Sequence, residues 1–336
     1  MDQGSALQPI VQVHPTRRCN LRCLHCYSVS GPEERDLLPY QLLEQCLTDA
    51  RAEGYTVASF SGGEPVLYRG LEALLWHAKG LGMRTTVTSN GMLLTTARLA
   101  ALVGCTDVLA ISLDGVPQSH NRMRACDYAF ESMLAKLEEV RKSGIDFGFI
   151  FTLTLYNVNE IEWAAQFAVE QGAKLFQIHP LEEVGRAADK LTGARPDEVE
   201  SAYAYLEAER IRQKYGDQLF VQLDITHRDL MARHPERFYG AQDAAPRLAD
   251  CVTPLVVEAD GTVVPLGYGF GRQYALGSLL NEGFRDLAAR WRATVYPQFR
   301  ELCRRAYDLA CQPSELPFLN WYELIGGQSL SSQPAI

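Results

Sequence analysis

Three cysteines, Cys19, Cys23 and Cys26, lie within eight residues near the start of the chain. Thiolates this close together cannot all lie on one face of a helix or strand, so we expect a loop around a group that accepts several soft sulfur ligands. Iron–sulfur clusters and zinc are the groups such ligands prefer. Structural zinc normally takes four protein ligands, and the customary second cysteine or histidine pair is missing from this sequence. The pattern therefore favours an iron–sulfur cluster with one open iron.

The overall composition limits the class of protein. Nine cysteines in 336 residues, an odd number, and a start without the pattern of a secretion signal predict a reduced, cytoplasmic chain, which argues against a disulfide framework. Acidic residues outnumber basic ones by 41 to 32, so neither nucleic acid nor an anionic membrane is expected as a partner. Apolar runs stay shorter than the ~18–20 residues of a membrane span.

The elements that must position the cysteines alternate between strands and helices. Strands are predicted at residues 9–15, 56–60, 85–88, 107–113, 147–155 and 174–178, and helices at 37–53, 71–80, 95–103, 128–143 and 161–171. This alternation predicts an α/β fold, a partial (β/α)6 TIM-like barrel whose ligands bind at the carboxyl ends of parallel strands.

Residues suited to ligand binding follow several of these strands. The cysteine loop comes after the first strand, and Ser61-Gly62-Gly63-Glu64-Pro65 comes after the second. Asn90 follows the third strand and Asp114 follows the fourth. Adjacent glycines allow a backbone to approach a ligand closely, so the carboxyl end of the sheet is the predicted site.

The pattern changes near residue 196. We expect a long helix at 196–215, a hairpin of 255–258 and 262–266 around Asp260-Gly261, and a helical segment at 284–307 that breaks near Pro297. The last ten residues are expected to fray. Residues 1–216 are therefore assigned to the partial barrel, and residues 217–336 to a smaller α+β extension.

The pattern Cys-x3-Cys-x-His-Cys after a first strand resembles that of the radical S-adenosylmethionine (radical SAM) superfamily. The resemblance implies that Cys19, Cys23 and Cys26 hold a [4Fe-4S] cluster whose open iron binds S-adenosylmethionine (SAM). It also implies reductive cleavage of SAM to a 5'-deoxyadenosyl radical, which abstracts a hydrogen atom, and an oxygen-sensitive enzyme.

The same resemblance assigns residues to SAM. Gly62, Gly63 and Glu64 match the segment that meets the amino group of SAM. Ser112, Asp114 and Arg124 resemble the residues that hold the ribose and the methionine carboxylate. Asn121 stands where the family usually has aspartate.

Four further residues are implied as cofactor contacts. His25 lies where the family places a residue near the adenine, and Asn90, Thr152 and Leu181 lie at the ends of the third, fifth and sixth strands. The alternative for Ser112, Asp114 or Arg124 taken singly is a surface or capping role. The alternative for His25 is an ordinary polar residue, and for Thr152 it is a position in a half-buried strand.

The C-terminal part is similar to the SPASM or twitch extension of the superfamily, which carries an auxiliary cluster. Cys251 and Gly261 fit that pattern, but Leu266 occupies the position of a second cysteine, and Cys303 and Cys311 are separated by seven residues. The extension is therefore expected to lack its cluster, because leucine cannot replace a thiolate. An intact auxiliary cluster is the alternative.

The resemblance implies hydrogen abstraction from a carbon of a ribosomally synthesised peptide. The alternatives are the same chemistry on a small metabolite (a sugar, nucleoside or amino acid) and a non-catalytic iron–sulfur or zinc protein. An electron donor such as flavodoxin or ferredoxin is an expected partner. Because only 18 residues precede Cys19, a peptide substrate is expected to need a separate peptide-recognition protein or to dock directly. Candidates for a catalytic proton or hydrogen donor are Cys126, Asp224 and His227.

Overall fold

The parallel strands follow one another in chain order around a barrel. The computed structural model describes residues 8–239 and 247–331. Neighbouring strands pair in parallel, as in the register of Val11 with Ala58, and the inferred α/β fold is confirmed. The strands are β1 (Ile10–Val13), β2 (Val57–Phe60), β3 (Arg84–Ser89), β4 (Val108–Ser112), β5 (Phe147–Leu153), β6 (Leu175–Pro180) and β7 (Phe220–Leu223).

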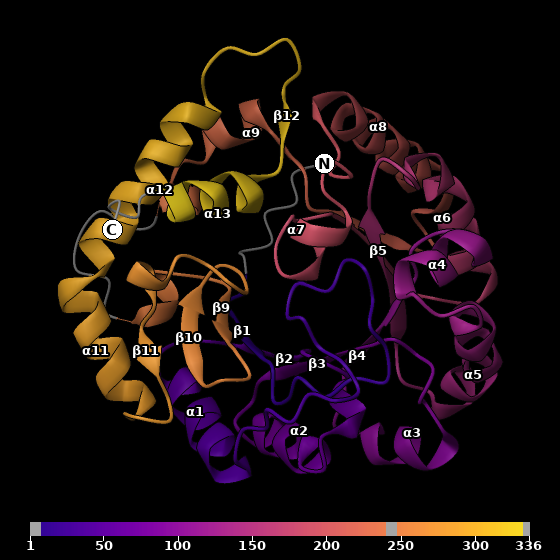
Figure 1. Cartoon of the computed structure of the whole chain (residues 1–336), viewed down its shortest axis with the longest axis horizontal. Coiled ribbons are helices and arrows are strands. Elements are labelled where there is room, and N and C mark those ends of the chain that lie inside the picture. The colour runs from indigo at the N-terminus through magenta and orange to yellow at the C-terminus, as the bar shows by residue number, and fades with distance from the viewer. Residues whose placement is uncertain (1–7, 240–246, 332–336) are drawn as a thin grey trace.

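Helices cover the outside of this sheet (Figure 1). Each presents an apolar stripe to the strands; in α5, Phe130, Met133, Leu137 and Val140 are buried at helical spacing. The outer helices are α1 (Tyr40–Ala52), α2 (Leu71–Gly80), α3 (Thr96–Leu102), α5 (Ala129–Ser143), α6 (Ile161–Glu170) and α8 (Glu198–Tyr215). Two further helices, α4 (Pro117–Arg124) and α7 (Arg186–Lys190), follow the carboxyl ends of β4 and β6.

The C-terminal part continues the same sheet on the other side of β1. Strand β9 (Leu255–Val257) pairs in parallel with β1. Strand β10 (Thr262–Pro265) pairs antiparallel with β9, which confirms the predicted hairpin. With β11 (Gly277–Ser278) the order is β11-β10-β9-β1-β2-β3-β4-β5-β6-β7, an open sheet whose edges are β11 and β7. A small second sheet joins β8 (Thr226–His227) to β12 (Phe318–Leu319).

The remaining helices pack beside this extension (Figure 1). They are α9 (Arg228–Arg233), α10 (Glu236–Tyr239), α11 (Phe284–Thr294), α12 (Tyr296–Ala310) and α13 (Trp321–Ser331). Pro297 lies in the first turn of α12, so the expected break separates two helices. Of the last ten residues, 327–331 are helical rather than frayed, and 332–336 lie outside the described residues.

One apolar core serves both parts of the chain. Phe149 and Phe151 of the barrel belong to the same contiguous cluster of buried side chains as Trp291 and Phe299 of the extension. The boundary at residue 216 stays a prediction, since both the sheet and the core run across it. None of the helices in the described ranges has the length and apolar character needed to cross a membrane.

Candidate functional site

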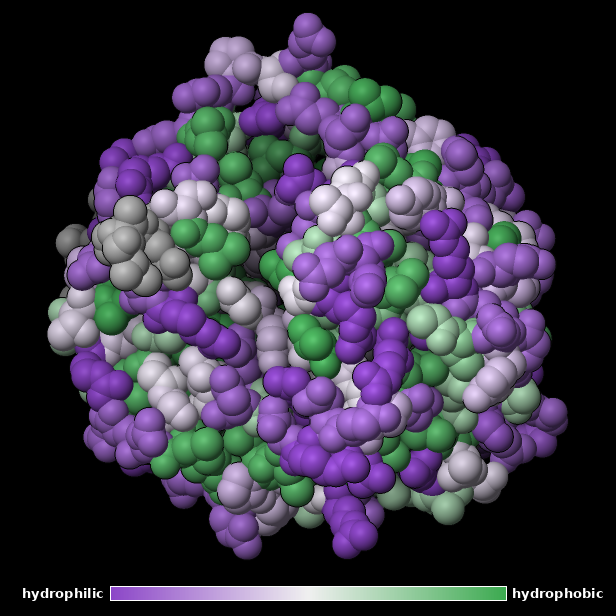
Figure 2. Space-filling view, in the orientation of Figure 1, coloured by the Kyte–Doolittle hydropathy of each residue, from purple (hydrophilic) through white to green (hydrophobic). Residues whose placement is uncertain are grey.

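A cavity of about 550 Å³ lies inside the barrel. Its wall takes alternate residues from the strands, such as Thr86 and Thr88 of β3 and Gln177 and His179 of β6, because every second side chain of a strand points inward. Figure 2 shows the outer face of the molecule, with a hollow between the C-terminal elements on the left and the rest of the barrel. Cys19, Cys23 and Cys26 all line this cavity.

Each of the three sulfur atoms accepts a hydrogen bond from the protein. The donors are the backbone N–H of Leu21 to Cys19 Sγ (3.5 Å), the backbone N–H of Ser30 to Cys26 Sγ (3.3 Å) and Arg124 Nη1 to Cys23 Sγ (3.7 Å). Donors to sulfur stabilise thiolate ligands and tune the potential of iron–sulfur clusters. The donor set therefore fits a cluster.

Burial keeps the thiols of Cys19 and Cys23 protonated when no metal is bound. It raises the pKa of Cys19 to about 12 and also raises the pKa of Cys23. Cluster binding must therefore displace protons, as metal binding to cysteine generally does. Within residues 8–239 and 247–331, no three His, Cys, Asp or Glu side chains converge on the position of a single ion. In a four-iron cluster each thiolate binds a different iron, so its ligands surround a volume rather than a point.

The turn between β6 and α7 holds the cysteine loop from outside. Arg186 donates from Nη1 to the Cys23 carbonyl (2.7 Å) and from Nη2 to the Ser30 carbonyl (2.9 Å), and its backbone N–H donates to the Cys26 carbonyl (2.9 Å). Gly185 has a φ of 59° and lies so close to the Tyr27 carbonyl that an added Cβ would overlap it. These contacts, which we call the clamp, were not predicted from the sequence.

Arg124 reaches the cavity from α4, and Asp114 lies behind it. Arg124 Nε donates to Asp114 Oδ2 at 2.6 Å, and the Asp114 side chain is fully buried. Burial disfavours the charge of Asp114, but Arg124 and the nearby His25 and His120 outweigh it and lower its pKa to about 2. In this structure Asp114 orients Arg124 and does not itself line the cavity.

Glu64 also lies behind the cavity wall. Its carboxylate is fully buried and accepts hydrogen bonds from the backbone N–H groups of Asn90 (2.9 Å) and Val66 (3.4 Å), so it ties the loop after β2 to the loop after β3. Burial raises its pKa to about 7. Gly63 is needed in the same turn, because a side chain there would overlap the Arg18 carbonyl.

Most residues that the sequence assigned to SAM surround the cavity. Those in its wall are His25, Gly62, Gly63, Asn90, Ser112, Arg124, Thr152 and Leu181, whereas Glu64 and Asp114 are not.

The three catalytic candidates lie in different places. Asp224 lines the cavity. Cys126 packs against the group of buried side chains that contains Cys19 and Cys23, without joining the cavity wall. The His227 imidazole accepts a hydrogen bond from the backbone N–H of Asp229 at the start of α9, which is a capping role.

Several cavity residues were not anticipated. They are the polar side chains His179, Glu182, Gln222 and Tyr322, together with Tyr268 after β10. The ring of Tyr268 packs against that of Tyr27 with centroids 5.4 Å apart and planes tilted by 53°, and this contact joins the extension to the cysteine loop. The period-two polar pattern of β6 and β7 was the available sequence signal.

The cysteines of the extension are not part of the wall of this cavity. Cys251 and Cys303 are buried and Cys311 is exposed. Leu266 lies in the cavity wall with a φ of 64°. The loss of an auxiliary cluster stays a prediction.

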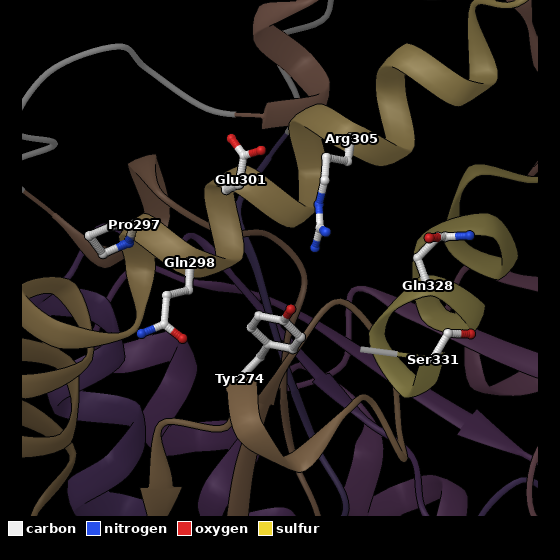
Figure 3. Close-up of a pocket in the computed structure, with 7 residues that line it drawn as sticks. All are labelled: Tyr274, Pro297, Gln298, Glu301, Arg305, Gln328 and Ser331. Carbon is white, nitrogen blue, oxygen red and sulfur yellow. The ribbon is translucent and has the colours of Figure 1, made fainter. Parts of the chain in front are cut away.

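A second hollow, of about 700 Å³, lies between α12 and α13 (Figure 3). It is lined by Tyr274, Pro297, Gln298, Glu301, Arg305, Gln328 and Ser331. These residues include none of those that follow the barrel strands, so the cavity that holds the cysteines is the candidate active site.

The fold and site define an α/β-barrel protein with a three-cysteine loop at the end of its first strand. Residues 13–168 match the model of the radical SAM superfamily, and this part of the chain is a radical SAM domain. Members of the superfamily are enzymes that use a [4Fe-4S] cluster and SAM.

Two relatives show different extents of similarity. The chain is 34% identical over 157 residues to Fe-coproporphyrin III synthase of Methanosarcina barkeri, covering 46% of this chain and 39% of that protein. It is 24% identical over 311 residues to the sporulation killing factor maturation protein SkfB of Bacillus subtilis, covering 90% of this chain and 70% of SkfB. The chain spans less than half the length of the first relative.

Solved structures share the fold. Streptococcus suis SuiB bound to precursor peptide SuiA superposes with a TM-score of 0.67 at 16% identity, over 87% of this chain and 66% of SuiB. The enzyme anSMEcpe with bound AdoMet and the Kp18Cys peptide superposes with a TM-score of 0.65 at 16% identity, over 96% of both chains. SuiB has also been solved with SAM bound.

Proposed function

We propose that this protein reductively cleaves SAM and abstracts a hydrogen atom from a carbon of a peptide substrate. The observation that carries the proposal is that three cysteines with hydrogen-bonded sulfurs share one cavity with an inward polar wall. When bound at Cys19, Cys23 and Cys26, a [4Fe-4S] cluster supplies the electron and the open iron for this chemistry.

The protein's own residues bind and orient the cofactor. Arg124, fixed by the buried Asp114, offers a guanidinium suited to the carboxylate of SAM. Gly62 and Gly63 leave room for the SAM amino group near backbone carbonyls, and Ser112 and Thr152 provide hydroxyls. Leu181, which is buried, shields the cavity from water beside them.

A peptide is the proposed substrate because the similarities that span most of the chain are to peptide-related proteins. SkfB is named as a maturation protein, and its match covers 90% of this chain. SuiB and anSMEcpe, which share the fold, have been solved with peptides bound.

A tetrapyrrole is the second candidate substrate, because the 34% identity to Fe-coproporphyrin III synthase is higher than the identity to SkfB. That match covers only 46% of this chain, so it bears on the barrel more than on the extension. An electron donor such as flavodoxin or ferredoxin and a separate peptide-recognition protein are proposed partners in the cytoplasm.

Anaerobic reconstitution tests the cofactor chemistry. The protein should bind iron and sulfide and, with dithionite and SAM, release 5'-deoxyadenosine. Cys26→Ala should lose the cluster and SAM cleavage together, whereas Cys311→Ala, at an exposed cysteine, should keep both. Zinc in place of iron, or a cluster that never cleaves SAM, would contradict the enzyme proposal.

Deuterium transfer tests the substrate class. A perdeuterated substrate peptide should transfer deuterium to 5'-deoxyadenosine and change mass in the same reaction. Transfer from a tetrapyrrole or a small metabolite, with none from peptides, would favour those substrates instead.

A further inference from the structure

Polar side chains gather in the part of the cavity wall formed by β6, β7 and the segment after β6. We refer to His179, Glu182 and Asp224, with their neighbours Gln177 and Gln222, as the acidic lobe. Glu182 follows Leu181 directly in the sequence and both line the cavity, so the lobe lies beside the region assigned to SAM.

Both carboxylate oxygens of Asp224 already form hydrogen bonds with other side chains of the lobe. Its Oδ2 accepts from Gln177 Nε2 at 2.7 Å and lies 2.9 Å from His179 Nδ1, and its Oδ1 accepts from Gln222 Nε2 at 2.9 Å. Because both oxygens are engaged, Asp224 fixes the His179 ring and has little capacity left for a ligand.

Glu182 is in the opposite situation. Its Oε1 forms an ion pair with His179 Nε2 at 3.7 Å, which is too long for a hydrogen bond, and among residues 8–239 and 247–331 the carboxylate has no hydrogen-bond donor. The side chain is only 27% exposed and faces the cavity. A half-enclosed carboxylate with one distant ion pair and no hydrogen bond is stabilised by a cation that binds it in the cavity.

The charges of the lobe sum to a negative value. Burial disfavours a charged His179, but the hydrogen bond to Asp224 and the charges of Asp224 and Glu182 raise its pKa to about 9, so it is an imidazolium at neutral pH. One imidazolium and two carboxylates leave one negative charge. Tyr322 remains neutral, since desolvation in the cavity wall and the same two carboxylates raise its pKa to about 12.

The nearby arginines already have hydrogen-bond or ion-pair partners outside the lobe. Arg195 forms an ion pair with Glu323, Arg124 pairs with Asp114, and Arg186 donates to two carbonyls of the cysteine loop. These arginines therefore do not neutralise the negative charge of the lobe, and the lobe would repel an anionic group of a ligand.

We propose that the acidic lobe binds the cationic side chain of a lysine or arginine in the substrate peptide, with Glu182 as the direct partner. The lobe thus selects peptides with a basic residue next to the position of modification. This assignment rests on the peptide substrate proposed above.

Binding of short peptides to the reconstituted full-length protein tests the assignment, with saturation-transfer NMR as the measurement. The probes are acetyl-Gly-Lys-Gly-amide, its norleucine counterpart, which has nearly the same shape but no charge, and its glutamate counterpart. The lysine peptide should bind roughly fivefold more tightly than the norleucine peptide, and the glutamate peptide most weakly.

Variants of the lobe supply the controls. Glu182→Gln should bring the lysine peptide to the affinity of the norleucine peptide, and Glu182→Lys should reverse the preference toward glutamate. Glu183→Gln, which makes the same charge change where the side chain accepts a hydrogen bond from the Gly193 N–H, should keep the wild-type preference.

Equal binding of the lysine and norleucine peptides, no detectable binding of any peptide, or a preference that survives in Glu182→Gln would overturn the assignment. SAM cleavage measured on the same samples separates the two proposals. Release of 5'-deoxyadenosine without a charge preference leaves the proposed chemistry standing and refutes the lobe alone, and its absence refutes the chemistry.

Discussion

The clamp that Arg186 places on the cysteine loop leads to a quantitative prediction for Arg186→Ala. The side chain donates to the carbonyls of Cys23 and Ser30 at 2.7 and 2.9 Å. A hydrogen bond from a charged donor contributes about 1.5–3 kcal/mol, and taking the lower value for each of two bonds gives about 3 kcal/mol. Local opening of the loop should then become roughly 100-fold more frequent.

The assay is anaerobic release of iron from the reconstituted protein to a chelator. If iron leaves through the opened loop, Arg186→Ala should release it roughly 100-fold faster than the unmodified protein. Arg186→Lys keeps a single donor group and should release it about tenfold faster.

Arg35 provides a matched control near the same loop. It too donates to two backbone carbonyls, those of Pro32 and Glu34, but it is exposed and its partners are close in sequence. Arg35→Ala should change the release rate by less than about twofold. A release rate in Arg186→Ala within about threefold of the unmodified protein would refute the clamp.

Three further predictions concern stability and are measured by urea unfolding. Asp114→Asn should lower the free energy of unfolding by about 3–5 kcal/mol, because it leaves the buried Arg124 without its carboxylate; a loss below about 1 kcal/mol would speak against that ion pair. Val29→Gly should raise the free energy by about 1 kcal/mol, since this exposed β-branched residue has a φ of 54°; a loss of stability would contradict the strain. The raised pKa of His179 stabilises the fold fully below about pH 6.5, and this contribution is lost as the pH rises through about 9. Because the imidazole is 35% exposed, we expect a fall of about 1 kcal/mol, which His179→Gln should abolish; the same fall in that variant would assign it to another group.

The parts of the fold that follow local patterns could be predicted from the sequence. The alternation of strands and helices and the hairpin around Asp260-Gly261 depend on residues close together in the chain. Helix α4 was not predicted, because it is mostly polar and buries only His120, Met123 and Arg124. Its packing depends on the cysteine loop and on Asp114, which no local pattern reveals.

The site was predictable where residue type determines the chemistry, as for the three cysteines. The site was less predictable where the role of a residue depends on its position in the fold. Glu64 and Asp114 have the types of ligand-binding residues but bind backbone and arginine behind the cavity wall. Arg186 bonds to carbonyl groups, which every residue carries, so its partners leave no trace in the sequence. The parallel pairing of β9 with β1 likewise joins segments with no local relation.

That last pairing has a consequence for the synthesis of the protein in the cell. Val11 of β1 pairs with Ala58 on one side and with Leu255 on the other, and the second neighbour is encoded about 240 residues downstream. At ~5–20 residues per second, a ribosome needs roughly 12–50 s to produce it. During that interval the strand that leads into the cysteine loop has one uncovered edge, which is open to pairing with other nascent chains. Translation speed between the codons for β1 and those for β9 should therefore influence how much protein reaches its native state.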